Sequence, residues 1–339
     1  MTSDTLVWYA LRARLGDEGM RMLAALGAVS LGTLTASGGA WADDGQPTAV
    51  WNFTLENDWA GGSDKNYSGG WQVSRTARLG ERPKRTTYLQ LGVAQQFYTP
   101  QFDFALRPLP EEHPYASLLL GEGKLAFDYG TGKPIDIISV QIGVVGPQAQ
   151  GEEVQNFVHD LIGQREGRGW DNQIGNAVFG QIGFERRWTG LGGDAGALVF
   201  DVVPSVGASL GNALIAAEAG VTLRLGRNLD RPLGEPRLEP SGGGIAWHEP
   251  SGAGPRARYA FLGVVGRGVA HKVWLDGRFG EDEIVEQHSE PFVYDVQGGF
   301  VLPFGGDSRL GIAYMYRSET FETFGETQGI GVVSLSSRF

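Results

Sequence analysis

The segment Ala49-Val50-Trp51-Asn52-Phe53-Thr54-Leu55-Glu56 alternates between two kinds of side chain. Its apolar residues Trp51, Phe53 and Leu55 occupy every second position, and Asn52, Thr54 and Glu56 stand between them. Successive side chains of a β-strand point to opposite faces, so a period of two predicts a strand with one apolar and one polar face.

The same alternation recurs through most of the chain after residue 42. Long antiparallel strands of this kind are typical of an outer-membrane barrel, and many here exceed the usual five or six residues. We therefore predict an all-β fold, a single antiparallel transmembrane β-barrel of about twelve strands. The expected strands lie near residues 48–57, 67–79, 85–98, 115–129, 134–147, 175–190, 195–210, 213–226, 256–271, 291–303, 308–321 and 327–339.

The end of the chain agrees with this prediction. Val333, Leu335 and Phe339 share one strand face, and Ser334, Ser336 and Arg338 share the other. A last strand that ends on an aromatic residue resembles the C-terminal signature of bacterial outer-membrane proteins. No apolar run after residue 42 reaches the roughly 18 residues of a membrane helix.

The composition excludes several classes of function. The net charge of −11 argues against a nucleic-acid partner, because phosphates require a basic surface. The absence of Cys excludes a disulfide framework and a Cys-ligated zinc or iron–sulfur site. It also suits a protein that crosses an oxidising periplasm unfolded.

The first 42 residues have the pattern of a secretory signal peptide. Arg21 precedes an apolar stretch, and Ala40-Trp41-Ala42 provides an A-x-A cleavage site. Residues 1–19 are unusual ahead of such a signal, so Met20 is a candidate for the true start. The expected organisation is a signal peptide over 1–42 and one barrel domain over 43–339.

The strand order predicts which loops lie on which side of the membrane. Barrels of this class begin and end in the periplasm, so loops after odd-numbered strands are extracellular. One stretch, residues 227–255, is long and rich in Pro and Gly yet falls on the periplasmic side. Either the count is wrong by one hairpin there, or the stretch is an unusual insertion on the inner side.

Residues 152–162 form the one convincing helix of the mature chain, within the third extracellular loop. Val154, Phe157, Val158, Leu161 and Ile162 give it an apolar stripe, and Gly163 suits the position after its end. Gln155 and His159 are four residues apart and share a face beside that stripe. If the stripe packs on the barrel wall, both point into the crevice between helix and wall.

Several polar motifs fall in the first three extracellular loops, and as a set they resemble the outer-membrane lipid A 3′-O-deacylases. The resemblance covers essentially all of 43–339, and its specific motifs lie within 56–176. These motifs are Glu56-Asn57-Asp58, Asp64…Tyr67-Ser68-x-Gly70, Pro114-Tyr115-Ala116, Gly146-Pro147, Gly151-x-x-x-Gln155-Asn156-x-x-His159 and Trp170-x-x-Gln173.

The resemblance implies a calcium-dependent ester hydrolase that acts on lipid A of lipopolysaccharide, with its site between the outer barrel wall and a loop helix. The residues that match the family's functional positions are Asn57, Asp58, Ser68, Gln155 and His159. Ser68 stands where Thr is common, which keeps the hydroxyl. His113 stands where Arg is common and Ser117 replaces a frequent Gly, and we expect these departures to bear on substrate contacts.

The residue types suggest how each would act. His159, as a neutral imidazole, can take a proton from water. The Asp58 carboxylate and the Asn57 amide oxygen are hard ligands of the kind that Ca²⁺ prefers, and Ca²⁺ would stabilise the oxyanion. Gln155 would orient the water or the ester, and Ser68 would donate a hydrogen bond nearby. We expect the enzyme to act as a monomer among outer-membrane lipids.

The phase of the strands leaves one conflict. Asn57 is in phase with the lipid-facing Trp51, Phe53 and Leu55, whereas Asp58 and Ser68 fall in the other phase. The rim must bend, or a loop must rearrange, if all three are to meet one substrate.

Other functions remain open at this stage. Ser68 and His159 could belong to a barrel-type phospholipase with a Ser–His–Asn arrangement, which would work without calcium. A porin-like barrel without enzymatic activity would be insensitive to His159. The G-x-S-x-G match at Gly207-Ala208-Ser209-Leu210-Gly211 lacks the strand–turn–helix context of a serine esterase.

Overall fold

The computed structural model describes residues 49–63, 65–101, 112–234, 244–250, 256–278, 287–322 and 326–338. The signal peptide expected over 1–42, the motif residue Asp64 and the terminal Phe339 lie outside these described residues. The signal peptide and the start at Met20 therefore stay predictions.

Within the described residues, thirteen strands form one antiparallel sheet. Their bounds are β1 Ala49–Asn57, β2 Asn66–Arg82, β3 Arg85–Thr99, β4 Ala116–Asp128, β5 Ile135–Val145, β6 Ala177–Arg187, β7 Leu191–Ala195, β8 Leu198–Gly211, β9 Leu214–Arg227, β10 Arg258–Lys272, β11 Phe292–Pro303, β12 Ser308–Arg317 and β13 Gln328–Arg338.

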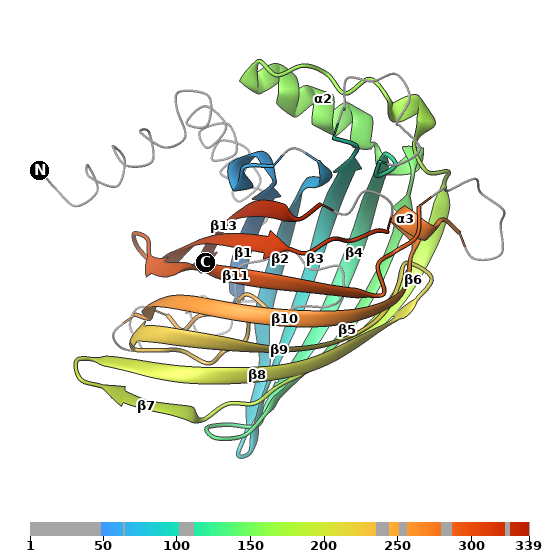
Figure 1. The fold of residues 1–339 in the computed structure, drawn as a ribbon. Coiled ribbons are helices and arrows are strands. Elements are labelled where there is room, and N and C mark those ends of the chain that lie inside the picture. The colour runs from blue at the N-terminus through green and yellow to red at the C-terminus, as the bar shows by residue number, and fades with distance from the viewer. Residues whose placement is uncertain are drawn as a thin grey trace, which may run out of the picture.

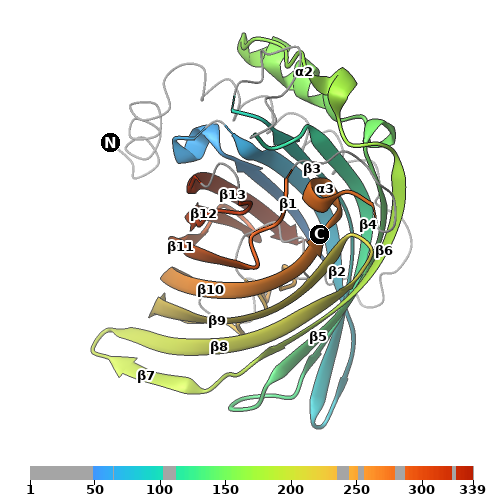
Figure 2. The same ribbon diagram turned by 45° about the vertical axis from the view of Figure 1, so that its right-hand side comes forward.

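Two pairings close this sheet into a barrel of twelve strands (Figures 1 and 2). The first strand pairs with the last, with Val50 opposite Arg338 and Asn57 opposite Gly331. Strand β8 pairs with β6 through residues 205–211 and with β7 through residues 198–202. Because β7 and β6 pair with successive parts of the same edge of β8, they together fill one strand position of the barrel. The predicted fold class is confirmed.

Alternation decides which side chains face the interior. In β1, Asn52, Thr54 and Glu56 are buried inside the barrel. In β5, Ile138, Val140 and Ile142 are exposed on the outer surface, whereas Ser139 and Gln141 between them are buried. An apolar outer surface around a polar interior is the arrangement of a barrel in lipid.

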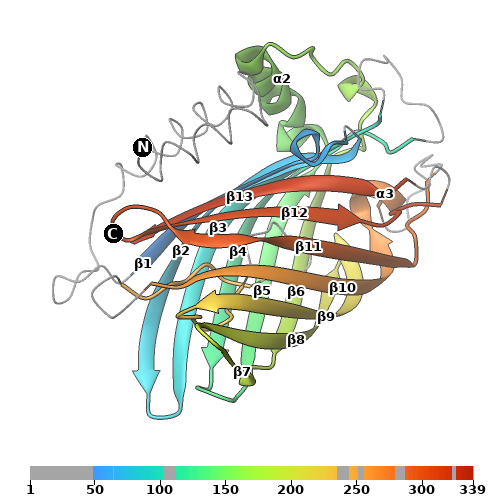
Figure 3. The same cartoon turned by 60° about the vertical axis from the view of Figure 1, so that its left-hand side comes forward.

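The two ends of the barrel differ. The helix α2 (Gly151–Ile162) and the short helix α3 (Val273–Asp276) lie at one end, and the tip of the β2–β3 hairpin lies at the other (Figures 1 and 3). Three short 3₁₀ turns, Trp59–Gly61, Pro147–Ala149 and Trp170–Asn172, are also in loops at the helical end. Of the helices described, none is both long and apolar enough to cross a membrane.

The inner-side stretch around 227–255 enters the barrel at the end away from α2. Its described parts are residues 228–234 and 244–250, joined by a hydrogen bond from the Ile245 amide to the Leu233 carbonyl (2.8 Å). Leu233, Ile245 and Trp247 pack in a buried cluster with side chains of the barrel wall. The strand count was therefore right, and the stretch is an insertion. We call residues 228–234 and 244–250 the plug.

Ion pairs and ring contacts attach the plug to several strands. Arg231 Nε donates to Asp128 of β4 at 2.7 Å. Asp230 accepts from Arg309 of β12 at 2.6 Å. The ring of Trp247 lies 4.9 Å from that of Tyr88 in β3 and under the guanidinium of Arg338 in β13. These strands lie on different sides of the barrel, so the plug crosses its interior.

Candidate active site on the outer wall

A β-bulge brings Ser68 to the outer face of the barrel. The pairing of β2 with β3 shifts register between Tyr67 and Gly69, which leaves Ser68 as the extra residue. Its hydroxyl lies within hydrogen-bond distance (2.5 Å) of the hydroxyl of Thr99, the last residue of β3. Thr99 shares its strand face with Phe97 and the exposed Leu91 and Val93. The bulge accounts for the change of phase at Ser68, and Asp58 lies beyond the end of β1.

Asn57 and Asp58 converge on the same backbone. The Asn57 side-chain amide donates to the Ser68 carbonyl at 3.1 Å, and the Asp58 amide approaches that carbonyl at 3.4 Å. The Asp58 carboxylate is 1 % exposed and accepts from the Lys65 amide at 2.6 Å. The structure thus brings together Asn57, Asp58 and Ser68, and it adds Thr99.

Thr99 is a member of this group that the sequence analysis missed. The signal was present, because Thr99 continues the outward series that contains Leu91, Val93 and Phe97. Its partner Ser68 could not be placed opposite it without knowledge of the bulge.

An aromatic cluster lies on the outer wall next to the polar group. Phe97, Tyr115 and Trp170 are buried together, with Trp71 and Val154 packed against them. Trp71 donates to Gln95 at 2.9 Å, and Gln95 donates to the Ala149 carbonyl just before α2 at 2.6 Å. The base of the helix is therefore fixed to strands β2 and β3.

The first turn of α2 approaches the wall very closely. A Cβ on Gly151 would lie 2.4 Å from the Cβ of Ser117 and 2.8 Å from the ring of Trp170. Only glycine fits at that contact. The helix ends at Gly163, whose φ of 75° is the left-handed conformation that glycine adopts without strain.

The apolar stripe of α2 does not pack on the wall as predicted. Phe157 is 59 % exposed and Leu161 is 49 % exposed, and Val154 is the stripe residue that joins the aromatic cluster. The contact is made instead by the face that carries Gly151 and Gln155. A glycine and a hydrogen-bonded amide allow closer approach to the wall than the bulky stripe does. This explains why that face of α2, and not the stripe, is turned toward the wall.

Gln155 and His159 each have a defined partner in the segment after the helix. Gln155 Oε1 accepts from the indole N–H of Trp170 at 2.8 Å. His159 Nδ1 lies 2.5 Å from the carbonyl oxygen of Arg165. Because a carbonyl can only accept, Nδ1 carries the hydrogen, and the lone pair of the neutral ring is on Nε2. That is the state in which a histidine can take a proton from water.

The oxygen donors at the rim suit a hard cation. Asp58 supplies a carboxylate, Asn57 an amide oxygen, and Ser68 and Thr99 hydroxyls, with no nitrogen or sulfur ligand among them. Among the residues described, no group of three or more His, Cys, Asp and Glu could hold a metal ion. A calcium site at Asn57 and Asp58 stays a prediction.

Negative charge gathers at the start of α2. Burial and the nearby carboxylates of Asp171, Glu153 and Glu166 raise the pKa of Glu152. Burial is the larger cause of this shift, and the neighbouring carboxylates add to it.

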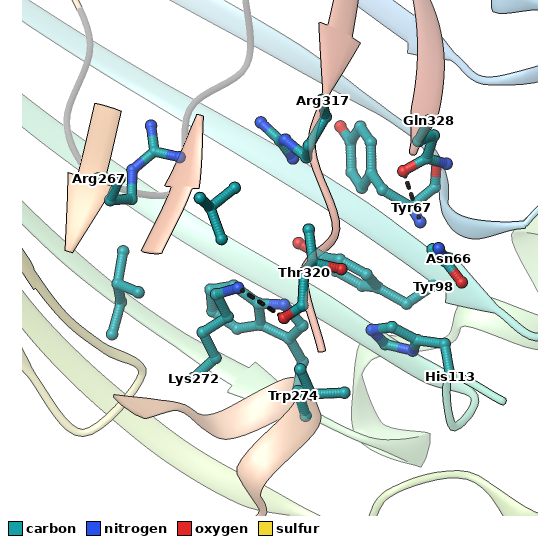
Figure 4. Close-up of a pocket in the computed structure, with 13 residues that line it drawn as sticks. Asn66, Tyr67, Tyr98, His113, Arg267, Lys272, Trp274, Arg317, Thr320 and Gln328 are labelled. Atoms are coloured by element: carbon teal, nitrogen blue, oxygen red, sulfur yellow. Dashed lines mark hydrogen bonds between the residues drawn. The ribbon is translucent and has the colours of Figure 1, made fainter. Parts of the chain in front are cut away.

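His113 lies in the interior of the barrel and not at the outer wall. Its ring stacks on Tyr98 with centroids 5.2 Å apart and meets the edge of Phe321 at 5.8 Å. Figure 4 shows it in a pocket with Trp274, Lys272 and Gln328. Burial lowers the pKa of His113 to about 4, so it is neutral at pH 7. Its expected effect on substrate contacts is not supported by this position.

Ser117 lies under the start of α2 with its hydroxyl buried. It supports Gly151 and the helix, which is a structural reason for a small residue at this position.

The G-x-S-x-G match lies in the straight strand β8, so Ser209 is not on a nucleophile elbow.

Comparisons with known proteins agree with this architecture. The sequence model of the family described as "Outer membrane protein LpxR" matches residues 26–339. The structure is similar to that of LpxR from Salmonella typhimurium, with a TM-score of 0.72, 19 % identity, and coverage of 86 % of this chain and 100 % of that one.

More distant barrels also match. The β domain of the Bordetella autotransporter BrkA gives a TM-score of 0.44 at 12 % identity, covering 86 % of this chain and 99 % of that one. No curated protein sequence matches the chain significantly.

Proposed function

Because the chain belongs to the LpxR family of outer-membrane lipid A 3′-O-deacylases, we propose that it removes the 3′-linked acyloxyacyl chain of lipid A at the extracellular rim of its barrel. The protein is a lipid A ester hydrolase of the outer membrane. The observation that carries the proposal is the convergence of Asn57, Asp58, Ser68 and Thr99 at the ends of strands β1, β2 and β3.

The orientation in the membrane follows from the two ends of the barrel. Outer-membrane barrels have short periplasmic turns and longer extracellular loops. The long loops with α2 and α3 lie at the end away from Val50 and Arg338, which pair at the start of β1 and the end of β13. We place the site on the extracellular side on this basis. A closed barrel has no long unpaired edge, which supports a monomer.

His159 activates the water that cleaves the ester. As the water oxygen bonds to the acyl carbonyl carbon, one of its protons passes to His159 Nε2. The bond between that carbon and the sugar-side oxygen then breaks, and the proton moves from Nε2 to the departing oxygen. The products are a carboxylic acid and a free hydroxyl on lipid A. The Arg165 carbonyl holds the ring in the required tautomer throughout.

Gln155 and Ser68 assist as hydrogen-bond donors. The Oε1 atom of Gln155 is held by Trp170, so its NH₂ group is the part left to contact water or the ester carbonyl. Ser68 shares one hydrogen bond with Thr99, and its own O–H is free to donate to the substrate when Thr99 is the donor in that bond.

Calcium would be held by Asn57 and Asp58, whose oxygens match its preference. When bound, Ca²⁺ supplies polarisation of the ester carbonyl and stabilisation of negative charge on its oxygen.

The geometry favours hydrolysis by activated water over a Ser–His–Asn phospholipase and over a porin. In a Ser–His–Asn arrangement, the asparagine would accept from His Nδ1, but Nδ1 of His159 contacts the Arg165 carbonyl and Asn57 contacts the Ser68 backbone. In a porin the interior is a water-filled channel, whereas here the plug crosses it.

Replacing the serine hydroxyl separates water activation from a serine nucleophile. If water attacks, Ser68→Ala loses one hydrogen bond and roughly 3- to 30-fold in kcat, and Ser68→Thr keeps near-parental activity. The purified protein would not react with a fluorophosphonate probe. A serine nucleophile instead predicts complete loss in Ser68→Ala and labelling of the wild type that this variant abolishes.

A further inference from the structure

The chain leaves α2 at Gly163 and runs back along the helix through Trp170. Three hydrogen bonds fasten this return segment, residues 163–170, to polar side chains of the helix. His159 Nδ1 bonds to Arg165 O, Asn156 Oδ1 accepts from Gly167 N at 3.1 Å, and Gln155 Oε1 accepts from Trp170 Nε1. In these three pairs the residue number increases along the segment while it decreases along the helix, so the two run antiparallel.

The far end of the return segment is fixed to the barrel wall. Trp170 is 1 % exposed, and its ring centroid lies 4.9 Å from that of Tyr115, which is itself fully buried. Gly151 on the helix and Gly167 on the segment both lie against this indole. The indole is therefore held between the wall and the helix, in one buried cluster with Phe97 and Tyr115.

Space around the indole hydrogen bond is restricted. A Cβ on Gly167 would lie 3.0 Å from Gln155 Oε1 and 3.1 Å from Trp170 Nε1. The glycine at 167 leaves room for this bond, which a side chain there would crowd.

We propose that Trp170 is a positioning residue for hydrolysis, which acts by holding Gln155 Oε1 so that the Gln155 NH₂ group faces the reacting ester. The inference rests on the proposed function. It concerns a residue that the mechanism above does not require to touch the substrate. An amide whose oxygen is fixed cannot exchange its oxygen for its nitrogen by rotation, so Gln155 presents donors only.

A double-mutant cycle tests this role. Trp170→Phe keeps an aromatic ring beside Tyr115 and removes the N–H, so we expect kcat to fall about 3- to 10-fold with little change in KM, the worth of one hydrogen bond. In a Gln155→Ala background the same substitution should have no further effect. An equal fall in both backgrounds would show that Trp170 is only structural and would overturn the proposal.

A conservative variant tests the donor claim. Gln155→Glu can still accept from the indole but has no NH₂ group, so it should lose as much activity as Gln155→Ala. Parental activity in Gln155→Glu would contradict the assigned orientation.

A measurement independent of activity checks the contact itself. In ¹⁵N-tryptophan-labelled protein in detergent, the resonance absent from Trp170→Phe belongs to Trp170. It should shift in Gln155→Ala and stay unchanged in Trp188→Phe, which removes a half-exposed indole near the opposite end of the barrel. A Trp170 resonance that ignores Gln155→Ala would overturn the proposal. Failure of the proposed function would look different, because the wild type itself would release no acyl chain.

Discussion

His159 has the two features that a general base on a surface helix needs. Its Nδ1 is held by the Arg165 carbonyl, and its Nε2 carries the lone pair. We expect His159→Ala to lower the deacylation rate about 10²- to 10⁴-fold, because a positioned general base contributes that much. Heat-modifiable gel mobility should show a normally folded barrel. A folded variant with the parental rate would rule out water activation by His159.

Asp58 is the buried carboxylate of the proposed calcium site, and its neighbours at the rim supply neutral oxygens. Asp58→Asn keeps an acceptor for the Lys65 amide and removes the charge, so the calcium concentration for half-maximal activity should rise at least about tenfold. Excess chelator should abolish wild-type activity, and added Ca²⁺ should restore it. The matched control is Asp160→Asn on the exposed side of α2. Undiminished activity in chelator would favour the serine mechanism.

The placement of α2 shows what a sequence pattern can and cannot decide. The pattern located the helix and its glycine cap to within one residue. The face that meets the wall followed from the contact of Gly151 with Ser117 and Trp170, which involves residues far apart in sequence. Hydrophobic periodicity gives a helix its apolar stripe but does not say whether protein or lipid lies against it.

The two faces of α2 should respond differently to substitution. Gly151→Val would place methyl groups into Ser117 and Trp170, so the helix must move off the wall and activity should fall at least about tenfold. Phe157→Ser should leave the helix seated, because that side chain is largely exposed. Trypsin cleavage after the exposed Arg165 and Arg168 reports helix position. Faster cleavage in Phe157→Ser than in Gly151→Val would contradict this packing.

The plug should loosen in acid because of His248. This ring is 6 % exposed, and its Nε2 is buried without a hydrogen-bond partner. Burial, with the positive charges of Arg309 and Arg338, lowers its pKa to about 4 against smaller opposing effects of the Glu249 carbonyl and Asp230. A released plug would regain the ordinary pKa of about 6.5.

The sign of the effect follows from these two values. Between pH 6.5 and about 4 the released state binds a proton that the docked state does not, so docking weakens by up to roughly 1.4 kcal/mol per pH unit as the pH falls. Single-channel recordings should show a nearly silent barrel at pH 7.5 and more frequent openings at pH 5, and His248→Gln should flatten this dependence. A large steady conductance at pH 7.5 would show that the plug does not close the barrel.

At the scale of the whole molecule, the sequence was most informative where one pattern repeats. Twelve alternating segments gave the barrel, because period-two burial is set by the backbone alone. The break between β6 and β7 and the bulge at Ser68 were not predictable, since both depend on register with a neighbouring strand. Asn57 and Asp58 were proposed from their motif, while the contacts of Thr99 with Ser68 and of Trp170 with Gln155 needed the assembled wall.

The central claim is that the rim of this barrel cleaves the 3′ acyl ester of lipid A through His159. The most direct test is mass spectrometry of lipid A from cells that retain the 3′ chain and produce either the wild type or His159→Ala at equal, heat-modifiable levels. We predict that the wild type lowers the mass of lipid A by one 3′-linked acyloxyacyl chain and that the variant leaves the mass unchanged. An unchanged mass with the wild type, or the same loss with the variant, would contradict the account.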